Sequence, residues 1–260
     1  MFIDSHCHLD RIDLAREGCS LETLLHQAHE QCVEQMLCVS IDLEQYQTMQ
    51  QAISAYPQVW ASAGVHPLHV DTHPFDEAKL RAAAAYPNVV ALGETGLDYY
   101  YSQDHLDAQH ESFAGHLRLA GELGLPVIVH TRDAREDTLK LIAEHGNLET
   151  SGVLHCFTES LDMAQAAVEM NYRISFSGII TFRNASELRE VVKAIPLQHL
   201  LIETDSPYLA PVPYRGKQNQ PAYVGKVAEC IAELKGIGVE EVAEVTRQNF
   251  YDLFTKAQPR

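Results

Sequence analysis

Eight short apolar runs recur along the chain, and helical patterns lie between them. Apolar residues at three- and four-residue spacing predict helices over 21–33, 107–123, 134–145 and 161–170. Two closing helices are expected over 222–234 and 239–254. Each apolar run is bounded by glycine, proline, asparagine or charged residues, as buried parallel strands are. The expected strands cover residues 2–6, 36–40, 59–64, 89–94, 126–130, 152–155, 172–177 and 200–205.

The ends of several helices carry recognisable signals. Ser160 and Asn184 precede helical patterns as N-cap residues do, and Gly124 and Gly146 stand where helices end. Strand–helix alternation repeated eight times is typical of a TIM (β/α)8 barrel. A doubly wound open sheet is the alternative, but it usually has fewer strands. The length fits a single barrel domain over residues 1–260.

Polar residues cluster at the carboxyl ends of the expected strands. A polar side chain in an apolar strand costs free energy unless it serves a purpose. TIM-barrel enzymes place their chemistry at the carboxyl ends of the strands. The pattern therefore predicts one functional site there, built from His6, His8, His66, Glu94, His130, His155, Glu203 and Asp205.

Imidazole and carboxylate groups of this set suit divalent metal ions. His6 and His8 are two residues apart, so both rings point to one face of an extended chain. Neutral imidazole is a common ligand for zinc and its first-row neighbours. Four histidines and two carboxylates exceed what one tetrahedral zinc requires. We expect two divalent ions (zinc, manganese or magnesium) per chain, held by His6, His8, Glu94, His130, His155 and Asp205.

Two carboxylates are the expected catalytic groups. Glu94, from the middle of the barrel, is expected to bridge the two ions. Asp205 is expected both to bind metal and to accept a proton from the attacking water. Glu203 lies two residues before Asp205 and is expected to orient an imidazole, with a plain charge pair as the alternative.

Charge and composition limit the substrate. A formal net charge of −17 argues against tight non-specific binding of duplex DNA. Cations on the expected strand-to-helix loops, including Arg132 and Arg215, could still hold a phosphate locally.

No apolar run is long enough to span a membrane, and no signal segment opens the chain. We therefore expect a cytoplasmic protein with no membrane contact and no obligate protein partner, its six cysteines reduced.

Seven motifs in order resemble those of the TatD family of metal-dependent deoxyribonucleases, in particular its bacterial YcfH-type subgroup. They are F-I-D-S-H-C-H-L-D, G-V-H-P, G-E-T-G-L-D-Y-Y, P-V-I-V-H-T-R, G-V-L-H-C-F-T, Y-R-I-S-F-S-G and L-L-I-E-T-D-S-P-Y-L-A-P. The resemblance covers essentially the whole chain. It implies an amidohydrolase-like barrel, binuclear phosphodiester hydrolysis and the same six ligands. It also implies that His66 faces the substrate.

Three functions are compatible with the residues. The first is a 3′–5′ deoxyribonuclease acting on DNA ends, short oligonucleotides or another phosphodiester, with His66, Arg132 and Arg215 binding substrate. The second is an amidohydrolase-like hydrolase of C–N or ester bonds in a small molecule. No expected strand ends in the lysine that often bridges metals in such enzymes, which favours the first. The third is a non-catalytic metal-binding protein, which a closed coordination shell would support.

Overall fold

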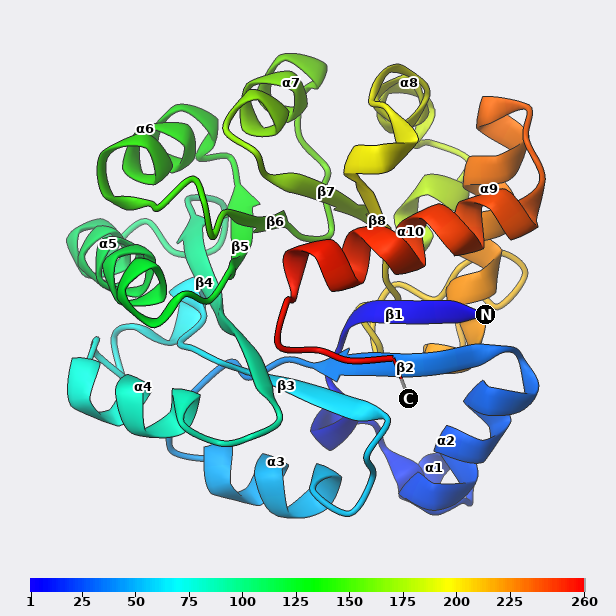
Figure 1. The fold of residues 1–260 in the computed structure, drawn as a ribbon, viewed down its shortest axis with the longest axis horizontal. Helices are drawn as coiled ribbons and strands as arrows, with labels where there is room; N and C mark the ends of the chain where they lie inside the picture. Colours follow the sequence, from blue (N-terminus) through cyan, green and yellow to red (C-terminus); the bar gives the residue numbers. More distant parts are fainter. Residues whose placement is uncertain (260) are drawn as a thin grey trace.

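The computed structural model describes residues 1–259 and arranges eight parallel strands in sequence order around a barrel (Figure 1). A parallel bridge between Cys7 and Ser206 joins the last strand region to the first. The predicted TIM barrel is therefore confirmed. The strands are β1 Phe2–Cys7, β2 Val33–Cys38, β3 Val59–Ala63, β4 Val89–Asp98, β5 Val127–Arg132, β6 Gly152–Leu154, β7 Arg173–Phe176 and β8 Leu200–Ile202.

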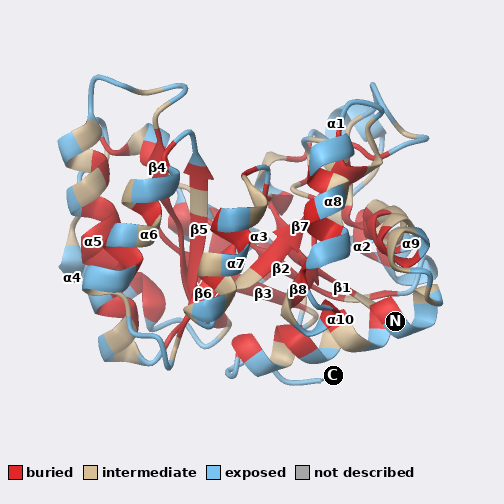
Figure 2. Cartoon of the chain, turned by 90° about the horizontal axis from the view of Figure 1, so that it is seen from above, coloured by how far each residue is buried: buried red, intermediate tan, exposed pale blue. Residues whose placement is uncertain are grey.

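Helices surround the barrel (Figure 1), and their buried apolar residues pack against those of the strands. Figure 2 shows buried strands at the centre, whereas the outer faces of the helices and the loops are exposed. No helix within residues 1–259 is long and apolar enough to cross a membrane. The α-helices are α1 Leu14–Glu17, α2 Leu21–Glu30, α3 Tyr46–Ile53, α4 Glu77–Ala84, α5 Leu106–Leu123, α6 Arg135–His145, α7 Leu161–Glu169, α8 Ser186–Ala194, α9 Val224–Lys235 and α10 Val239–Leu253.

Short 3-10 helices occupy several connections between these elements. They are η1 Leu9–Arg11, η2 Pro67–His69, η3 Gly178–Thr181, η4 Leu197–His199 and η5 Pro221–Tyr223. Two of them, η1 and η2, directly follow the sequence positions of His8 and His66. Each of these two histidines is therefore the N-cap residue of a short helical turn.

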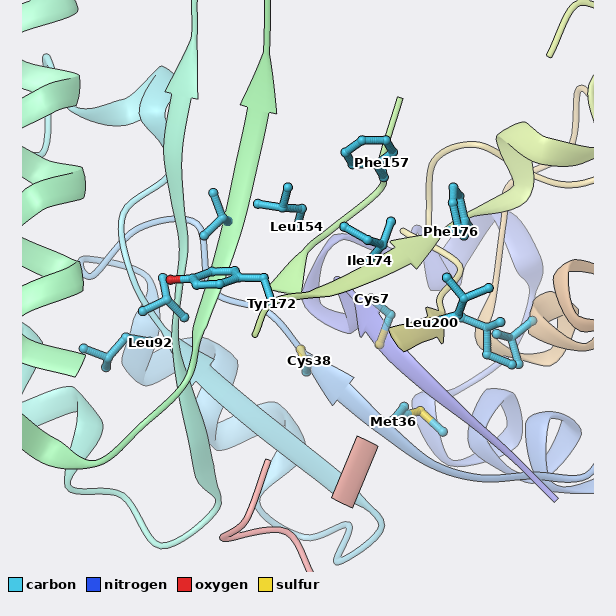
Figure 3. Packing of buried hydrophobic residues seen from close by; sticks show 14 of the residues in the cluster. Cys7, Met36, Cys38, Leu92, Leu154, Phe157, Tyr172, Ile174, Phe176 and Leu200 are labelled. Atoms are coloured by element: carbon cyan, nitrogen blue, oxygen red, sulfur yellow. The ribbon is translucent and has the colours of Figure 1, made fainter. Parts of the chain in front are cut away.

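Two apolar clusters hold the barrel together. One joins the strands to the surrounding helices, and Figure 3 shows part of it, with Phe157, Ile174 and Phe176 side by side. The other includes Ile3 and Leu201 of the strands with Phe250 and Phe254 at the end of α10. Helix α10 therefore closes the amino-terminal end of the barrel, which leaves the carboxyl end open for chemistry.

Some element boundaries differ from the sequence prediction. Strand β4 continues four residues past Glu94, because residues up to Asp98 still pair with β5. Ser160 caps α7 as predicted, since its side chain accepts a hydrogen bond from the amide of Met163. The prediction for Asn184 is wrong, because α8 begins after Ala185 and has no side-chain cap.

Strands β4 and β5 approach closely beside the site. Gly96 has φ +137°, and a Cβ atom there would lie 1.9 Å from the carbonyl oxygen of His130. Both the backbone angle and the contact exclude any side chain at this position. Glycine at position 96 therefore lets β4 pack directly against the backbone that carries His130.

Candidate metal centre

The six predicted metal ligands meet at the carboxyl end of the barrel. His6 and His8 come from β1 and the residue after it, Glu94 from β4, and His130 from β5. His155 and Asp205 follow β6 and β8, respectively. Nε2 of His6 lies 3.2 Å from Nε2 of His8, and the two nitrogens lie 3.4 and 3.9 Å from Oε2 of Glu94 on β4.

Glu94 lies at the centre of this cluster and is almost fully buried. Its Oε1 lies 2.8 Å from Nε2 of His155 and 3.2 Å from ring nitrogens of both His66 and His130. Its Oε2 faces the other way and lies 3.4 Å from Nε2 of His6. The two oxygens of one carboxylate thus face two different groups of histidines.

Asp205 completes the side of the cluster formed by β1 and β8. Its Oδ1 lies 3.4 Å from Nε2 of His8 and 3.8 Å from Nε2 of His6. The backbone fixes this arrangement, because the amide of Asp205 donates to the carbonyl of His6 at 2.9 Å. The amide of His8 in turn donates to the carbonyl of Ser206 at 2.7 Å.

A buried carboxyl group, that of Asp4, strengthens the same junction, and burial raises its pKa to about 8. Asp4 is fully buried and accepts hydrogen bonds from the amide of Thr204 at 2.8 Å and from its hydroxyl at 2.5 Å. It also accepts from the amide of His6 at 3.3 Å. Asp4 therefore holds the segment before Asp205 against the strand that carries His6 and His8.

The chemistry of these donors fits divalent cations. The ring nitrogens of His6 and His8 converge although both rings are buried, and at most one proton can lie between them. Among residues 1–259, three sets of side chains bring their ligand atoms within 4.8 Å of one another. They are His6–His8–Asp205, His66–Glu94–His130 and His6–His155–Glu203. Nitrogen and oxygen atoms gathered in this way form a suitable shell for a first-row divalent metal.

Burial and neighbouring charges determine the protonation of the cluster. Burial alone would raise the pKa of Glu94, but the surrounding histidines, His155 foremost, hold that pKa well below its usual value. Burial lowers the pKa of His66 to about 4 despite the nearby Glu94. Glu94 is therefore an anion at neutral pH, the form in which a carboxyl group binds metals, and His66 is a neutral ring.

Two further carboxylates contact the outer nitrogens of candidate ligands. Glu203 is fully buried, and its Oε1 lies 3.3 Å from Nδ1 of His155, where an orienting residue was predicted. Its other oxygen accepts a hydrogen bond from Ser175 at 2.5 Å. Asp98 contacts Nε2 of His130 at 2.9 Å. Carboxylates in such positions fix the orientation of metal-binding imidazoles.

Asp98 was not among the predicted site residues. It falls in the loop expected after the apolar run 89–94, because that run is expected to end at Glu94. A signal was present, however, since Glu94 and Asp98 are four residues apart, and even spacings lie on one face of a strand. Because β4 continues through residues 95–98, both carboxylates lie at the same site.

An open cavity of about 490 Å³ leads to these residues. Two arginines line it, Arg132 and Arg11, and so does His66. Arg215 lies elsewhere, with its guanidinium 3.6 Å from the ring centroid of Phe182. A larger hollow of about 1360 Å³ lies at the amino-terminal end, beside Phe2, and includes none of the candidate ligands.

Comparison with known proteins agrees with this geometry. The family described as TatD related DNase matches residues 3–255. An uncharacterized metal-dependent hydrolase of Escherichia coli K12, YcfH, is 50% identical over 252 residues, covering 97% of this chain and 95% of that protein. A protein of Escherichia fergusonii named 3′-5′ ssDNA/RNA exonuclease TatD is 36% identical over 230 residues. The match covers 85% of this chain and 88% of that protein.

A solved structure of a TatD homologue has the same fold. The crystal structure of YjjV, a TatD homologue from Escherichia coli K12, superposes with a TM-score of 0.90 at 30% identity. The superposition covers 98% of both chains. With the whole barrel and the matched motifs in common, the chain belongs to the TatD family of metal-dependent hydrolases.

Proposed function

We propose that this protein is a divalent-metal-dependent phosphodiesterase that shortens single-stranded DNA or short oligonucleotides from the 3′ end. The position of Glu94, between two groups of histidines at the base of an open cavity, carries the proposal. The relative named as a 3′–5′ ssDNA/RNA exonuclease supports the substrate class and the direction of attack.

Two ions per chain suit the arrangement of donors. His6, His8 and Asp205 would hold one ion, and His130 and His155 the other, with Glu94 between them. When bound, such ions polarise a phosphodiester and lower the pKa of water. Asp98 and Glu203 keep the rings of His130 and His155 oriented.

Asp205 is the proposed proton acceptor. Its side chain is 14% exposed and lines the cavity, so a water molecule can reach it. Burial would raise the pKa of this carboxyl, but His8 and His6 hold the pKa below its ordinary value. The carboxylate is therefore ionised at neutral pH and can accept a proton from water that attacks phosphorus.

Three side chains in the cavity wall are placed to bind the phosphodiester. Arg132 and Arg11 supply planar guanidinium groups that suit phosphate oxygens. His66 lies 3.2 Å from Glu94 and also faces the cavity. A few local cations in a chain with a net charge of −17 favour a short or single-stranded substrate over a long duplex.

The test uses metal-stripped protein and single-stranded DNA labelled at either end. Mg²⁺, Mn²⁺ or Zn²⁺ is restored separately, and an Asp205→Asn variant is the control for catalysis. We expect metal-dependent shortening from the 3′ end that falls at least about 100-fold in the variant. Metal-loaded protein that leaves DNA intact but cleaves a small ester or amide would replace this function with the amidohydrolase alternative.

A further inference from the structure

Two exposed tyrosines stand at the rim of the cavity that contains the candidate metal ligands. Tyr100 and Tyr101 follow β4, and 56% and 63% of their surfaces are exposed. Their rings pack edge to face with centroids 4.7 Å apart. Tyr101 lines the cavity together with His130. Paired aromatic rings left in water beside a site form a surface that a ligand can cover with a gain in free energy.

Arg132 connects these rings to the cavity. Its guanidinium lies 4.4 Å from the ring centroid of Tyr100 and 4.7 Å from that of Tyr101. Arg132 is also the last residue of β5, two positions after His130. Stacking restricts the guanidinium while leaving its N–H groups free to bind an anion. A phosphate-binding group and a stacking surface therefore lie side by side.

The backbone that carries the tyrosines is fixed relative to His130. One oxygen of Asp98 accepts hydrogen bonds from the amides of Tyr100 and Tyr101 at 3.0 and 2.8 Å. The other oxygen contacts His130 at 2.9 Å. The fully buried Gln109 bonds both the amide and the carbonyl of Asp98. A surface ordered in advance loses little entropy when it binds a ligand.

We propose that Tyr100, Tyr101 and Arg132 form a nucleobase platform, on which Tyr101 stacks a base of the single-stranded substrate next to the phosphodiester in the cavity. This platform rests on the proposed function. Aromatic rings accept bases of any sequence because every base has a flat π face. Beyond Tyr101 lies a hollow of about 530 Å³ beside Asp71 and Asp104. Two carboxylates there disfavour a phosphate and leave a neutral base as the suitable occupant.

The test compares variants on matched oligonucleotides. KM and kcat are measured with metal-loaded protein on one single-stranded DNA and on copies lacking the base at each of the last three positions in turn. Tyr101→Ala should raise KM about tenfold on the complete strand, and Tyr101→Phe less than about twofold. Tyr86→Ala is the matched control, because Tyr86 is 39% exposed but lies at the far end of the barrel beside Asn88.

The abasic strands distinguish stacking from a general structural loss. Removing the stacked base should weaken binding of the strand by the wild type. On that strand, Tyr101→Ala should then raise KM less than about twofold. An unchanged KM for Tyr101→Ala, or an equal loss on every strand, would overturn the platform while the nuclease stands. Fluorescence anisotropy of oligonucleotide binding makes the same comparison without turnover. Binding that depends on Tyr101 without cleavage would keep the platform and reject the proposed reaction.

Discussion

Asp98 lies 2.9 Å from Nε2 of His130, and Nδ1 of the same ring lies 3.2 Å from Glu94. The ring is therefore held between two carboxylates, one of them outside the cluster of candidate ligands. Such an outer partner fixes the orientation of an imidazole and increases its basicity toward a metal. The relationship makes Asp98 a positioning residue rather than a ligand.

Replacing Asp98 with asparagine should weaken metal binding about 10- to 100-fold while the protein stays folded. The exposed Asp107→Asn in the first turn of α5 is a matched control and should bind metal as the wild type does. Titration of metal-stripped protein with Mn²⁺ measures both affinities. Equal affinities for the two variants would show that Asp98 does not act on His130.

Arg132→Ala should raise the KM for single-stranded DNA about 10- to 100-fold, because a charged hydrogen bond to phosphate is lost. Arg215→Ala should change KM less than about threefold, since this side chain stacks on Phe182 away from the cavity lining. Steady-state kinetics on one oligonucleotide compares the two variants directly. A larger loss for Arg215 would return this residue to the binding site.

Acid should destabilise the protein through His116, a buried residue of α5 that is not one of the six candidate ligands. Burial lowers the pKa of this fully buried ring to about 4, and its Nε2 accepts a hydrogen bond from the amide of Val65 at 3.2 Å. Between pH 6.5 and 4 only the unfolded chain takes up a proton at this residue. Folding stability therefore falls by about 3 kcal/mol over that range, and the loss saturates below pH 4.

Urea unfolding of the wild type and of His116→Gln between pH 6.5 and 4 measures how much His116 contributes to the fall in stability. Glutamine carries an amide oxygen that can accept from Val65 but does not titrate. The variant should be less stable than the wild type at pH 7. On acidification, its free energy of unfolding should fall by about 3 kcal/mol less than that of the wild type. Parallel curves for the two proteins would exclude His116 as the source of the acid sensitivity.

Gly96→Ala should destabilise the fold by more than about 2 kcal/mol, through its backbone angle and its contact with the carbonyl of His130. Gly216→Ala separates these causes, because φ is +82° there but a Cβ atom would meet nothing within 4 Å. The free energy of unfolding of Gly216→Ala should fall by only about 1 kcal/mol. Thermal unfolding of both proteins gives the comparison, and equal losses would mean that the close approach of β4 to β5 contributes nothing.

The barrel and the positions of the six candidate ligands were predictable from the sequence. Buried parallel strands leave a strong apolar pattern, and the histidines follow those runs directly. Their convergence then depends only on strand order, which short right-handed connections impose. The number and identity of the metal ions do not follow from such a pattern, because the same side chains accept several divalent metals.

The remaining differences between the sequence prediction and the structure come from contacts between segments that are distant in the sequence. The continuation of β4 to Asp98 depends on pairing with β5, which local propensity does not reveal. Arg132 ends β5 and Arg215 lies in the loop after β8, so both follow strands at the same end of the barrel and their sequence positions look equivalent. Only the folded loops place Arg132 against Tyr101 and the cavity, and Arg215 against Phe182. Loop conformation, rather than strand order, thus determines which of the two arginines faces the cavity.

In the proposed site, Glu94 joins two metal ions into one hydrolytic centre. The most direct measurement titrates metal-stripped protein with Mn²⁺ and follows bound metal and cleavage of single-stranded DNA in the same samples. We expect activity to reach its plateau only at two bound ions per chain, and Glu94→Gln to lose both the second ion and nearly all cleavage. Full activity with one ion, or a Glu94→Gln variant that cleaves as the wild type does, would contradict the binuclear site.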